Sequence, residues 1–186
     1  MVLTENMRSD ARLFEAYTDL GSNLQEALER TRALFPASQR PARYTLTISH
    51  RNRMRINRLR NMQDAKDWDS IFLKAPKGTR GGNLPQDMIL WKGLQLIGAG
   101  HRCLKGLFYE VEEVTEEMVR LTSGLVLTHE QAILSLRLCY ALTYASCQGL
   151  TLPGVVRLDT RSNHFTLKHL YVGLSRGTAA DLVEVF

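Results

Sequence analysis

The stretch Tyr140-Ala-Leu-Thr-Tyr-Ala-Ser-Cys-Gln-Gly-Leu-Thr-Leu152, followed shortly by Leu170-Tyr-Val-Gly-Leu-Ser-Arg176, decides the fold of this chain. The apolar run at 132–143 has the character of a central buried strand, and 154–159 predicts a second strand. Residues 166–176 carry apolar side chains at helical spacing and predict a helix. Strands that alternate with helices indicate an α/β fold, with a mostly parallel sheet covered by helices on both faces.

The rest of the α/β pattern lies at the two ends of the chain. We expect helices at 3–20, 22–35 and 51–62, and strands at 44–49 and 181–186. Thr4 and Ser22 are candidate N-caps of the first two helices. Pro36 stops the second helix, and Gly177 closes the helix that ends at 176.

The middle of the chain has a different character. Residues 63–86 show little periodicity and are typical of a long surface loop. The Gly-rich part at 77–83 could cradle phosphate, but no strand precedes it and no helix follows it, so a surface loop is favoured. Residues 88–126 contain short apolar runs separated by glycines, which predicts antiparallel strands in a small β-rich insertion.

Composition narrows the class of protein. A chain of 186 residues suffices for one well-buried domain and leaves little room for a second core. No apolar run approaches the ~20 residues that span a bilayer, so we expect no membrane partner and an intracellular protein. Cys103, Cys139 and Cys147 lack metal-binding spacing and are interpreted as free thiols in a reducing compartment. A net charge of +5 permits nucleic-acid binding without proving it.

The positive charge is concentrated in one segment. His50-Arg-Asn-Arg-Met-Arg-Ile-Asn-Arg-Leu-Arg60 follows directly on the strand expected at 44–49. A solvated helix face is one interpretation of this basic run, in which Met54, Ile56, Leu59 and Met62 supply the inner contacts. The other is ligand binding, because the carboxyl ends of parallel strands are where open α/β sheets bind ligands.

The two motifs quoted first resemble, in their order, the last two motifs of the superfamily 1 helicases. The Gln-Gly-x-Thr turn of that family lies near the nucleotide phosphates, so the resemblance implies that Gln148 and Gly149 bind nucleotide. The arginine that ends Tyr-Val-x-Leu-Ser-Arg reaches the terminal phosphate of ATP in the family, which implies a catalytic role for Arg176. A planar, permanently charged guanidinium suits the charge that develops in phosphoryl transfer. The alternative is an ordinary arginine at a helix C-terminus.

Arg8 is the second catalytic candidate. Leu3-Thr-Glu-Asn-Met-Arg-Ser9 resembles the Leu-x-x-Asn-x-Arg-Ser element of the same family, whose arginine also meets the γ-phosphate. Two arginines that reach phosphates held by another domain would couple hydrolysis to domain closure.

The resemblance also implies a track for nucleic acid. Thr143 and Thr151 match family positions that touch the nucleic-acid backbone, and hydroxyl groups make such contacts without reading sequence. Ser49, His50 and Arg51 would line the same track, because the segment around them resembles a strand and helix that contact a single strand. Residues 88–126 resemble the small β-barrel inserted in the 5′-to-3′ branch of the superfamily.

Two positions depart from the family pattern, which is usually Thr-x-His-x-Ser-Gln-Gly. Ala145 stands at the histidine position and Cys147 at the serine position. The missing histidine weakens one link between the nucleotide state and the grip on nucleic acid. Cys147 as a catalytic nucleophile is not favoured, because no histidine lies near it in sequence.

The chain lacks half of a motor. It contains no Gly-Lys pair, so it has no Gly-x-x-x-x-Gly-Lys-Ser/Thr loop to cradle phosphate. It also lacks an apolar strand ending in an acidic pair that could hold magnesium. The resemblance therefore implies that ATP and Mg²⁺ are held mainly by a first RecA-like domain, upstream or on a partner, and that this segment alone is inactive.

We therefore expect residues 1–186 to form the second RecA-like domain of an ATP-dependent helicase acting on single-stranded nucleic acid, with DNA favoured over RNA. The alternative is a non-catalytic remnant that binds nucleic acid or protein. Ala145 and Cys147 favour the remnant, whereas the presence of both Arg8 and Arg176 argues against it. The expected location is the nucleus or cytoplasm, and the divergent motifs would suit a viral origin.

Overall fold

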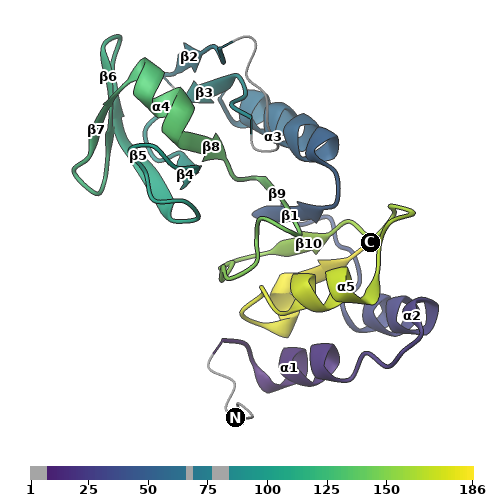
Figure 1. The fold of residues 1–186 in the computed structure, drawn as a ribbon. Coiled ribbons are helices and arrows are strands. Elements are labelled where there is room, and N and C mark those ends of the chain that lie inside the picture. Colours follow the sequence, from purple (N-terminus) through teal and green to yellow (C-terminus); the bar gives the residue numbers. More distant parts are fainter. Residues whose placement is uncertain (1–7, 66–68, 77–83) are drawn as a thin grey trace. The chain divides into compact units, whose positions relative to one another are not determined.

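The computed structural model describes residues 8–65, 69–76 and 84–186 of the chain (Figure 1). The chain divides into two compact units. Unit 1 is made of Met1–Ser49 together with Ala141–Phe186, and unit 2 is made of His50–Tyr140. The chain thus leaves unit 1 after Ser49 and re-enters it at Ala141.

Unit 1 is built on a four-stranded sheet in the order β11-β10-β1-β9, and all neighbouring strands are parallel. Its strands are β1 (Tyr44–Thr47), β9 (Ala141–Thr143), β10 (Val156–Leu158) and β11 (Val183–Val185). Leu46 in β1 lies opposite Leu158 on one side and Leu142 on the other, and all three are buried. The predicted α/β fold with a parallel sheet is confirmed.

The helices of unit 1 pack against this sheet or against one another. They are α1 (Ala11–Thr18), α2 (Leu24–Leu34), α5 (Leu167–Leu174) and the short 3-10 helix η2 (Ala180–Leu182). Gly173 brings α5 close to one face of the sheet, because a Cβ at this position would lie 2.8 Å from Leu158 and 2.9 Å from Tyr144. A larger residue would have to displace both side chains.

The opposite face of the same sheet holds a buried ion pair. Successive residues of a strand point to opposite faces, so Glu184 points away from Val183 and Val185. Arg157 donates to the fully buried Glu184 carboxylate at 2.7 and 2.9 Å, and Ser38 donates to its other oxygen. Burial alone raises the pKa of Glu184, but the hydrogen bonds and the charge of Arg157 outweigh it, so its pKa lies below the ordinary value of 4.5.

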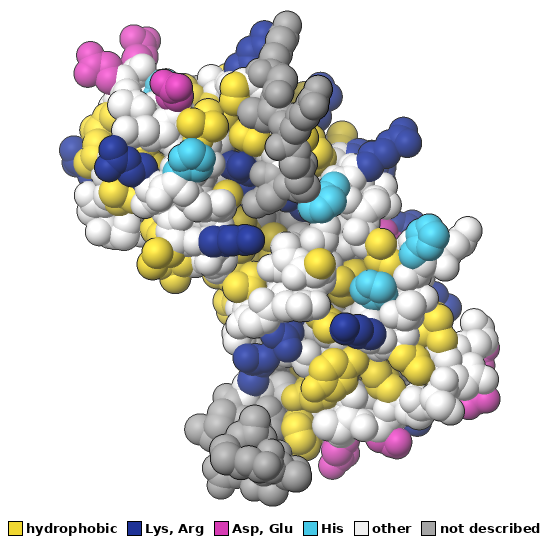
Figure 2. Space-filling model, viewed as in Figure 1, with side chains coloured by type: hydrophobic (Ala, Val, Ile, Leu, Met, Phe, Trp, Pro, Cys, Tyr) yellow, Lys and Arg dark blue, Asp and Glu magenta, His cyan; other side chains and the backbone are white. Residues whose placement is uncertain are grey.

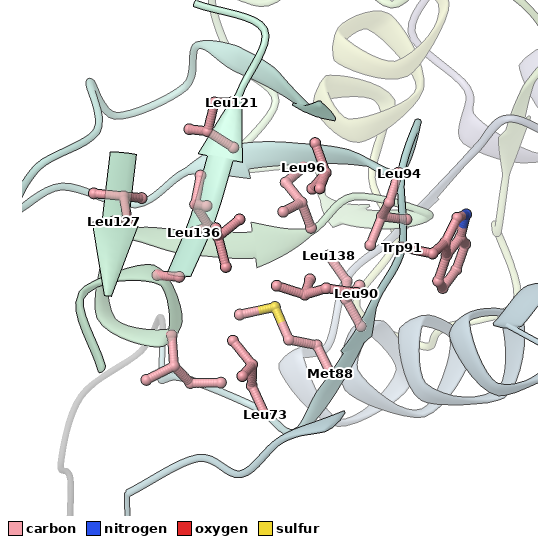
Figure 3. Packing of buried hydrophobic residues seen from close by; sticks show 14 of the residues in the cluster. Leu73, Met88, Leu90, Trp91, Leu94, Leu96, Leu121, Leu127, Leu136 and Leu138 are labelled. Atoms are coloured by element: carbon pink, nitrogen blue, oxygen red, sulfur yellow. The ribbon is translucent and has the colours of Figure 1, made fainter. Parts of the chain in front are cut away.

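In its described residues, unit 2 consists of antiparallel sheets and two α-helices. A five-stranded sheet has the order β7-β6-β5-β4-β8, and β2 pairs with β3 in a second sheet. The elements are α3 (His50–Asp64), β2 (Ile71–Leu73), β3 (Met88–Leu90), β4 (Gln95–Gly98), β5 (Phe108–Val114), β6 (Met118–Leu121), β7 (Val126–Thr128), α4 (His129–Ser135) and β8 (Leu136–Leu138). Figure 3 shows their shared apolar core, in which Met88 and Leu90 point toward Leu136 and Leu138. No helix in the described part of the chain is long and apolar enough to cross a membrane.

Helix α3 buries its polar side rather than its apolar side. Arg53, Asn57 and Asn61 are buried at a spacing of four residues, whereas Leu59 and Met62 are half exposed. The expectation that Leu59 and Met62 make the inner contacts is therefore wrong. The reason is hydrogen bonding, since the Asn61 side chain donates to the Ile89 carbonyl at 2.8 Å and accepts from the Ile89 N–H at 2.7 Å.

The apolar run at 132–143 is not one strand. It begins in α4, continues through β8 and ends in β9. Thr128 starts the helix, because its hydroxyl accepts from the Gln131 N–H while the Gln131 side chain accepts from the Thr128 N–H. An apolar run alone does not distinguish a buried strand from a buried helix, and this capping box decides for the helix.

Several predicted boundaries also change. Asp10 caps the first helix and Asn23 the second, while Thr4 lies outside the described residues. The expected loop at 63–86 contains β2, and its Gly-rich part at 77–83 lies outside the described residues. The last helix has Ser175 as its C-cap rather than Gly177. The C-terminal strand is preceded by η2.

Replacing Asn61 with leucine tests the buried polar side of α3. Asn61→Leu leaves the N–H and carbonyl of Ile89 without their side-chain partner, so we expect the free energy of unfolding to fall by about 1–3 kcal/mol in urea titrations. Met62→Ala on the neighbouring exposed position should change it by less than about 0.5 kcal/mol. Equal effects of the two substitutions would contradict this packing of α3.

The buried Glu184 gives unit 1 a pH dependence. Because the folded pKa lies below the ordinary value of 4.5, the ionised carboxylate stabilises the fold above that pH and loses this effect as the pH falls through the folded pKa. We expect the difference in melting temperature between the parent chain and Glu184→Gln to be largest near neutral pH and to shrink in acid. A difference independent of pH would argue against a stabilising ion pair.

Candidate functional site

The parallel sheet of unit 1 brings two loops to one edge. Strands β1 and β9 run side by side and end at Thr47 and Thr143, which are opposite one another. The N–H of Tyr144 donates to the carbonyl of Thr47 at 3.1 Å, so the pairing continues past the end of β9. The residues that follow both strands therefore lie at the carboxyl edge, where α/β sheets commonly bind ligands.

A compact turn follows β9. The hydroxyl of Thr143 accepts from the Ser146 N–H at 3.1 Å, and the hydroxyl of Ser146 donates to the Thr143 carbonyl at 3.0 Å. Thr143 is buried, so its hydroxyl belongs to the interior of this turn, whereas Ser146 and Thr151 are exposed. Sequence reasoning passed over Ser146, although a Thr-x-x-Ser spacing after a strand is a recognisable turn signal.

The Gln148-Gly149 pair forms the next turn. Gly149 has a φ of 85°, a backbone conformation that side chains other than glycine rarely adopt. A Cβ at Gly149 would meet no atom within 4 Å, so conformation rather than crowding requires glycine here. Both residues are exposed, and their backbone is accessible to a ligand.

The side chain of Arg176 lies against this second turn. Its Nη1 donates to the Leu150 carbonyl at 3.2 Å, and its Nη2 donates to the Ser175 hydroxyl at 2.8 Å. In the backbone, the Leu152 N–H donates to the Arg176 carbonyl at 2.9 Å. The structure thus joins the two motifs that stand apart in the sequence.

Arg8 interacts electrostatically with Arg176. Burial lowers the pKa of Arg176, and the positive charge of Arg8 is the next largest cause. Asp10 explains this proximity, because its N–H donates to the Thr178 carbonyl at 3.2 Å and its side chain accepts from the Ala180 N–H at 2.7 Å. Both predicted arginines therefore lie within electrostatic reach of one another in unit 1, and their role toward phosphate stays a prediction.

The predicted track residues at the start of α3 are divided between the units. Ser49 is the last residue of the first segment of unit 1, and His50 and Arg51 begin α3 in unit 2. All three are exposed. The prediction that these three residues and Thr143 contact the same nucleic-acid strand stays a prediction.

The chemistry of these side chains suits anions. Two guanidinium groups and an exposed glycine turn can hold phosphate oxygens. Residues 8–65, 69–76 and 84–186 contain no group of three or more histidines, cysteines or carboxylates that could hold a metal ion. Unit 1 thus presents side chains and backbone of the kind that can hold phosphate oxygens.

Cys147 lies beside Arg176 but is buried. Desolvation raises its pKa to about 11, although the positive charge of Arg176 acts in the opposite direction. Its Sγ is 3.3 Å from the Tyr144 carbonyl, which it can reach as a donor. This environment keeps the thiol protonated and agrees with the view that it is not a nucleophile.

Alkylation checks the state of Cys147. We expect the natively folded chain to leave Cys147 unmodified by iodoacetamide at neutral pH, because only the thiolate reacts and this side chain is fully buried. Mass spectrometry of peptides should show modification once guanidinium chloride unfolds the chain. Rapid modification of the folded protein would contradict the assignment.

Solved structures share this fold, whereas no family model and no curated protein matches the chain. The crystal structure of Pif1 helicase from Candida albicans has a TM-score of 0.61 at 16% identity, covering 95% of this chain and 53% of that one. Bacteroides Pif1 bound to ssDNA has a TM-score of 0.61 at 15% identity, covering 97% and 50%. Bacteroides Pif1 in complex with ADP-AlF3 and ssDNA has a TM-score of 0.59 at 14% identity, covering 98% and 51%.

The chain spans about half the length of these helicase chains. Identity at this level shows the fold and leaves activity open. The fold implied by the resemblance to superfamily 1 helicases is confirmed, since the structural match to Pif1 helicases covers 95% or more of this chain. This chain has the fold of the part of a Pif1 helicase that it covers.

Proposed function

We propose that this chain is the C-terminal motor domain of an ATP-dependent helicase and that it supplies two arginines to ATP bound by a first motor domain. The observation that supports this most is the position of Arg176, which is hydrogen-bonded to the turn after Gln148 and Gly149 and lies within electrostatic reach of Arg8. The shared fold with Pif1 helicases supports it independently.

Electrostatics favour an anion at this place. Burial and the charge of Arg8 both disfavour the charged form of Arg176, and the smaller influences of Cys147, Tyr171 and Tyr17 offset this only in part. An arginine stays charged in proteins, so its burial and its repulsion by Arg8 destabilise the fold until an anion binds. A phosphate group would lower the energy of both guanidinium groups at once.

The reaction divides between chemistry supplied by the nucleotide and positioning supplied by this chain. ATP with Mg²⁺, held mainly by the first motor domain, would provide the phosphoryl group and neutralise part of its charge. Arg176 and Arg8 would stabilise the charge that develops on the transferred group. The backbone at Gly149 would approach the phosphates, with Gln148 beside it.

The proposed nucleic-acid track uses the carboxyl edge of the sheet. Ser49, Thr143 and Thr151 would contact the backbone of a single strand, together with His50 and Arg51 at the start of α3. We propose DNA as the strand, because two Bacteroides Pif1 structures of this fold are bound to ssDNA. The buried Thr143 would act through the turn that it shares with Ser146, or through its backbone.

A non-catalytic remnant is the second candidate. Ala145 is exposed at the position where helicases of this type usually have histidine. One side chain that would link the state of the nucleotide to the binding of nucleic acid is therefore missing. A remnant would still bind nucleic acid through its basic residues but would not need Arg176 near a nucleotide. Hydrolysis of ATP separates the two candidates.

The deciding experiment uses the longest natural protein that contains this segment. We expect its ATPase activity to rise with single-stranded DNA, and Arg176→Ala to lower kcat by about 10³-fold or more while nucleotide binding is retained. Arg120→Ala is the matched control, because Arg120 forms a half-exposed ion pair with Glu113 at 3.2 Å. The segment of 186 residues alone should not hydrolyse ATP.

Two results would contradict the motor. One is a natural protein without DNA-stimulated ATPase activity. The other is an Arg176→Ala variant that hydrolyses ATP as fast as Arg120→Ala, which would leave the binding remnant as the better account.

A further inference from the structure

Helix α3 presents apolar side chains at the surface of unit 2. Its buried side carries Arg53, Asn57 and Asn61, which leaves Leu59 and Met62 49% and 50% exposed. Residues three apart on a helix are neighbours, so these two side chains form one apolar patch. Apolar side chains that lie together on a surface often mark an interaction site.

The patch borders a groove within unit 2, here called the α3 groove. The groove has a volume of about 640 Å³, which is in the range of ligand sites. Its apolar lining comes from α3 and from the segments after β2 and before β3, and consists of Met54, Leu59, Met62, Ala75 and Pro85. Methionine side chains adapt to the shape of what they contact, so the lining suits an occupant with apolar side chains.

The rim of the α3 groove is basic. Arg55 and Arg58 line it and are exposed, and neither forms an ion pair with another described residue. Asp87 also lines the groove, but its carboxylate already accepts from the Ala75 N–H at 2.8 Å. Positive charge therefore prevails at the rim and attracts an acidic occupant.

Unit 2 as a whole separates its charges. Figure 2 shows basic and apolar side chains interspersed over the visible face of this unit, at the upper left, with acidic side chains gathered at one end of it. In the sequence, the segment from His50 to Gln63 contains no acidic residue. The charge at the groove is thus a property of the helix that forms it.

A buried oxygen beside the α3 groove lacks a hydrogen bond. Gln86 lines the groove and is 7% exposed, and its Oε1 has no hydrogen-bond partner within 8–65, 69–76 and 84–186. A buried acceptor without a donor costs free energy, and such groups normally have a partner. An occupant of the groove that offers an N–H would remove this cost.

These features favour a peptide over a nucleic acid. The described residues that line the groove include no aromatic side chain, whereas single-strand sites usually stack bases on aromatic rings. A peptide carries a backbone N–H at every residue except proline. In an extended peptide successive side chains point to opposite sides, so apolar side chains can enter the groove while acidic ones stay at its rim.

We propose that the α3 groove binds a short, extended segment of a partner protein that carries apolar and acidic side chains. Its apolar side chains pack on Leu59 and Met62, and its carboxylates pair with Arg55 and Arg58. One of its backbone N–H groups donates to Oε1 of Gln86. This site goes beyond the proposed motor function, because it uses none of the residues proposed to contact phosphate or a nucleic-acid strand.

Fluorescence anisotropy with the 186-residue chain tests the groove. The probe is a fluorescein-labelled peptide of about ten residues in which leucine alternates with aspartate, and the matched probe has lysine in place of aspartate. We expect the acidic probe to bind, with an affinity that falls as salt screens the charges at the rim. The basic probe should not bind.

Substitutions in the lining should act on this binding. Leu59→Ala should weaken it about tenfold, because apolar contact area is lost. Arg58→Glu should weaken it at least as much and flatten its dependence on salt. The matched controls are Val126→Ala on β7, where the side chain is 50% exposed, and Lys105→Glu at an exposed position, neither of which lines the groove. Both controls should bind the acidic probe as the parent chain does.

Gln86→Leu separates binding from folding. The substitution removes the oxygen that lacks a partner, so we expect the melting temperature of the free chain not to fall. Binding of the acidic probe should nevertheless weaken by about tenfold, because its N–H loses the acceptor. A lower melting temperature with unchanged binding would mean that Gln86 only supports the fold.

Other results would overturn the proposal. Binding of the acidic probe by Leu59→Ala or Arg58→Glu at the parent affinity would place the peptide elsewhere. If oligodeoxythymidine displaced the probe and itself required Leu59, the groove would be a nucleic-acid site. A dimer in sedimentation that Leu59→Ala dissociates would make a second copy of the chain the occupant. None of these measurements depends on ATP hydrolysis, so failure of the motor and failure of the groove are distinguishable.

Discussion

The hydrogen bond from Arg176 to the Leu150 carbonyl is the contact on which the candidate site depends. It holds the end of α5 against the turn that follows β9, and the backbone bond between Leu152 and Arg176 reinforces it. Without this pair of bonds the two motifs would be separate surface features. The parallel sheet makes the contact possible. Strand β9 leads into the turn that contains Leu150, β10 leads into α5, and both strands run in the same direction. Asp10 then adds the start of the described chain to the same place.

Sequence patterns predicted unit 1 better than unit 2. The parallel strands around 44–47 and 156–158 and the helix after Thr166 follow from apolar spacing and caps that act locally. The resemblance, rather than any local pattern, predicted that Arg8 and Arg176 reach the same phosphate, and the long-range hydrogen bonds of Asp10 bring the two arginines within electrostatic reach. Whether these arginines meet a nucleotide stays a prediction. The roles of the threonines and of Ser49 also stay predictions.

Two predictions, the inner side of α3 and the single strand at 132–143, were wrong for physical reasons that an apolar pattern does not show. A pattern argument assumes that apolar side chains point inward, but in α3 the inner side is chosen by Asn57 and Asn61, which satisfy backbone groups of Leu138 and Ile89. Leaving a backbone carbonyl of a buried strand without a hydrogen bond costs more free energy than exposing a methionine side chain. The single strand predicted from the long apolar run that ends in β9 was wrong for a different reason, since a helix and a strand are equally apolar when both are buried. The Thr128–Gln131 capping box is a local sequence signal from which the start of the helix could have been predicted.

The segment from Thr143 to Leu152 is one short covalent span with a different task at each end. At one end Thr143 and Ser146 lie at the carboxyl edge of the sheet, and at the other end Leu150 and Leu152 bind Arg176. Between them Cys147 is fully buried and anchors the span to the interior. The span is therefore short and held at its middle, so that a displacement of one end can move the other end. Movement of Arg176 would be transmitted to Thr143 and Ser146 at the carboxyl edge of the sheet through the backbone itself, without a separate relay of side chains.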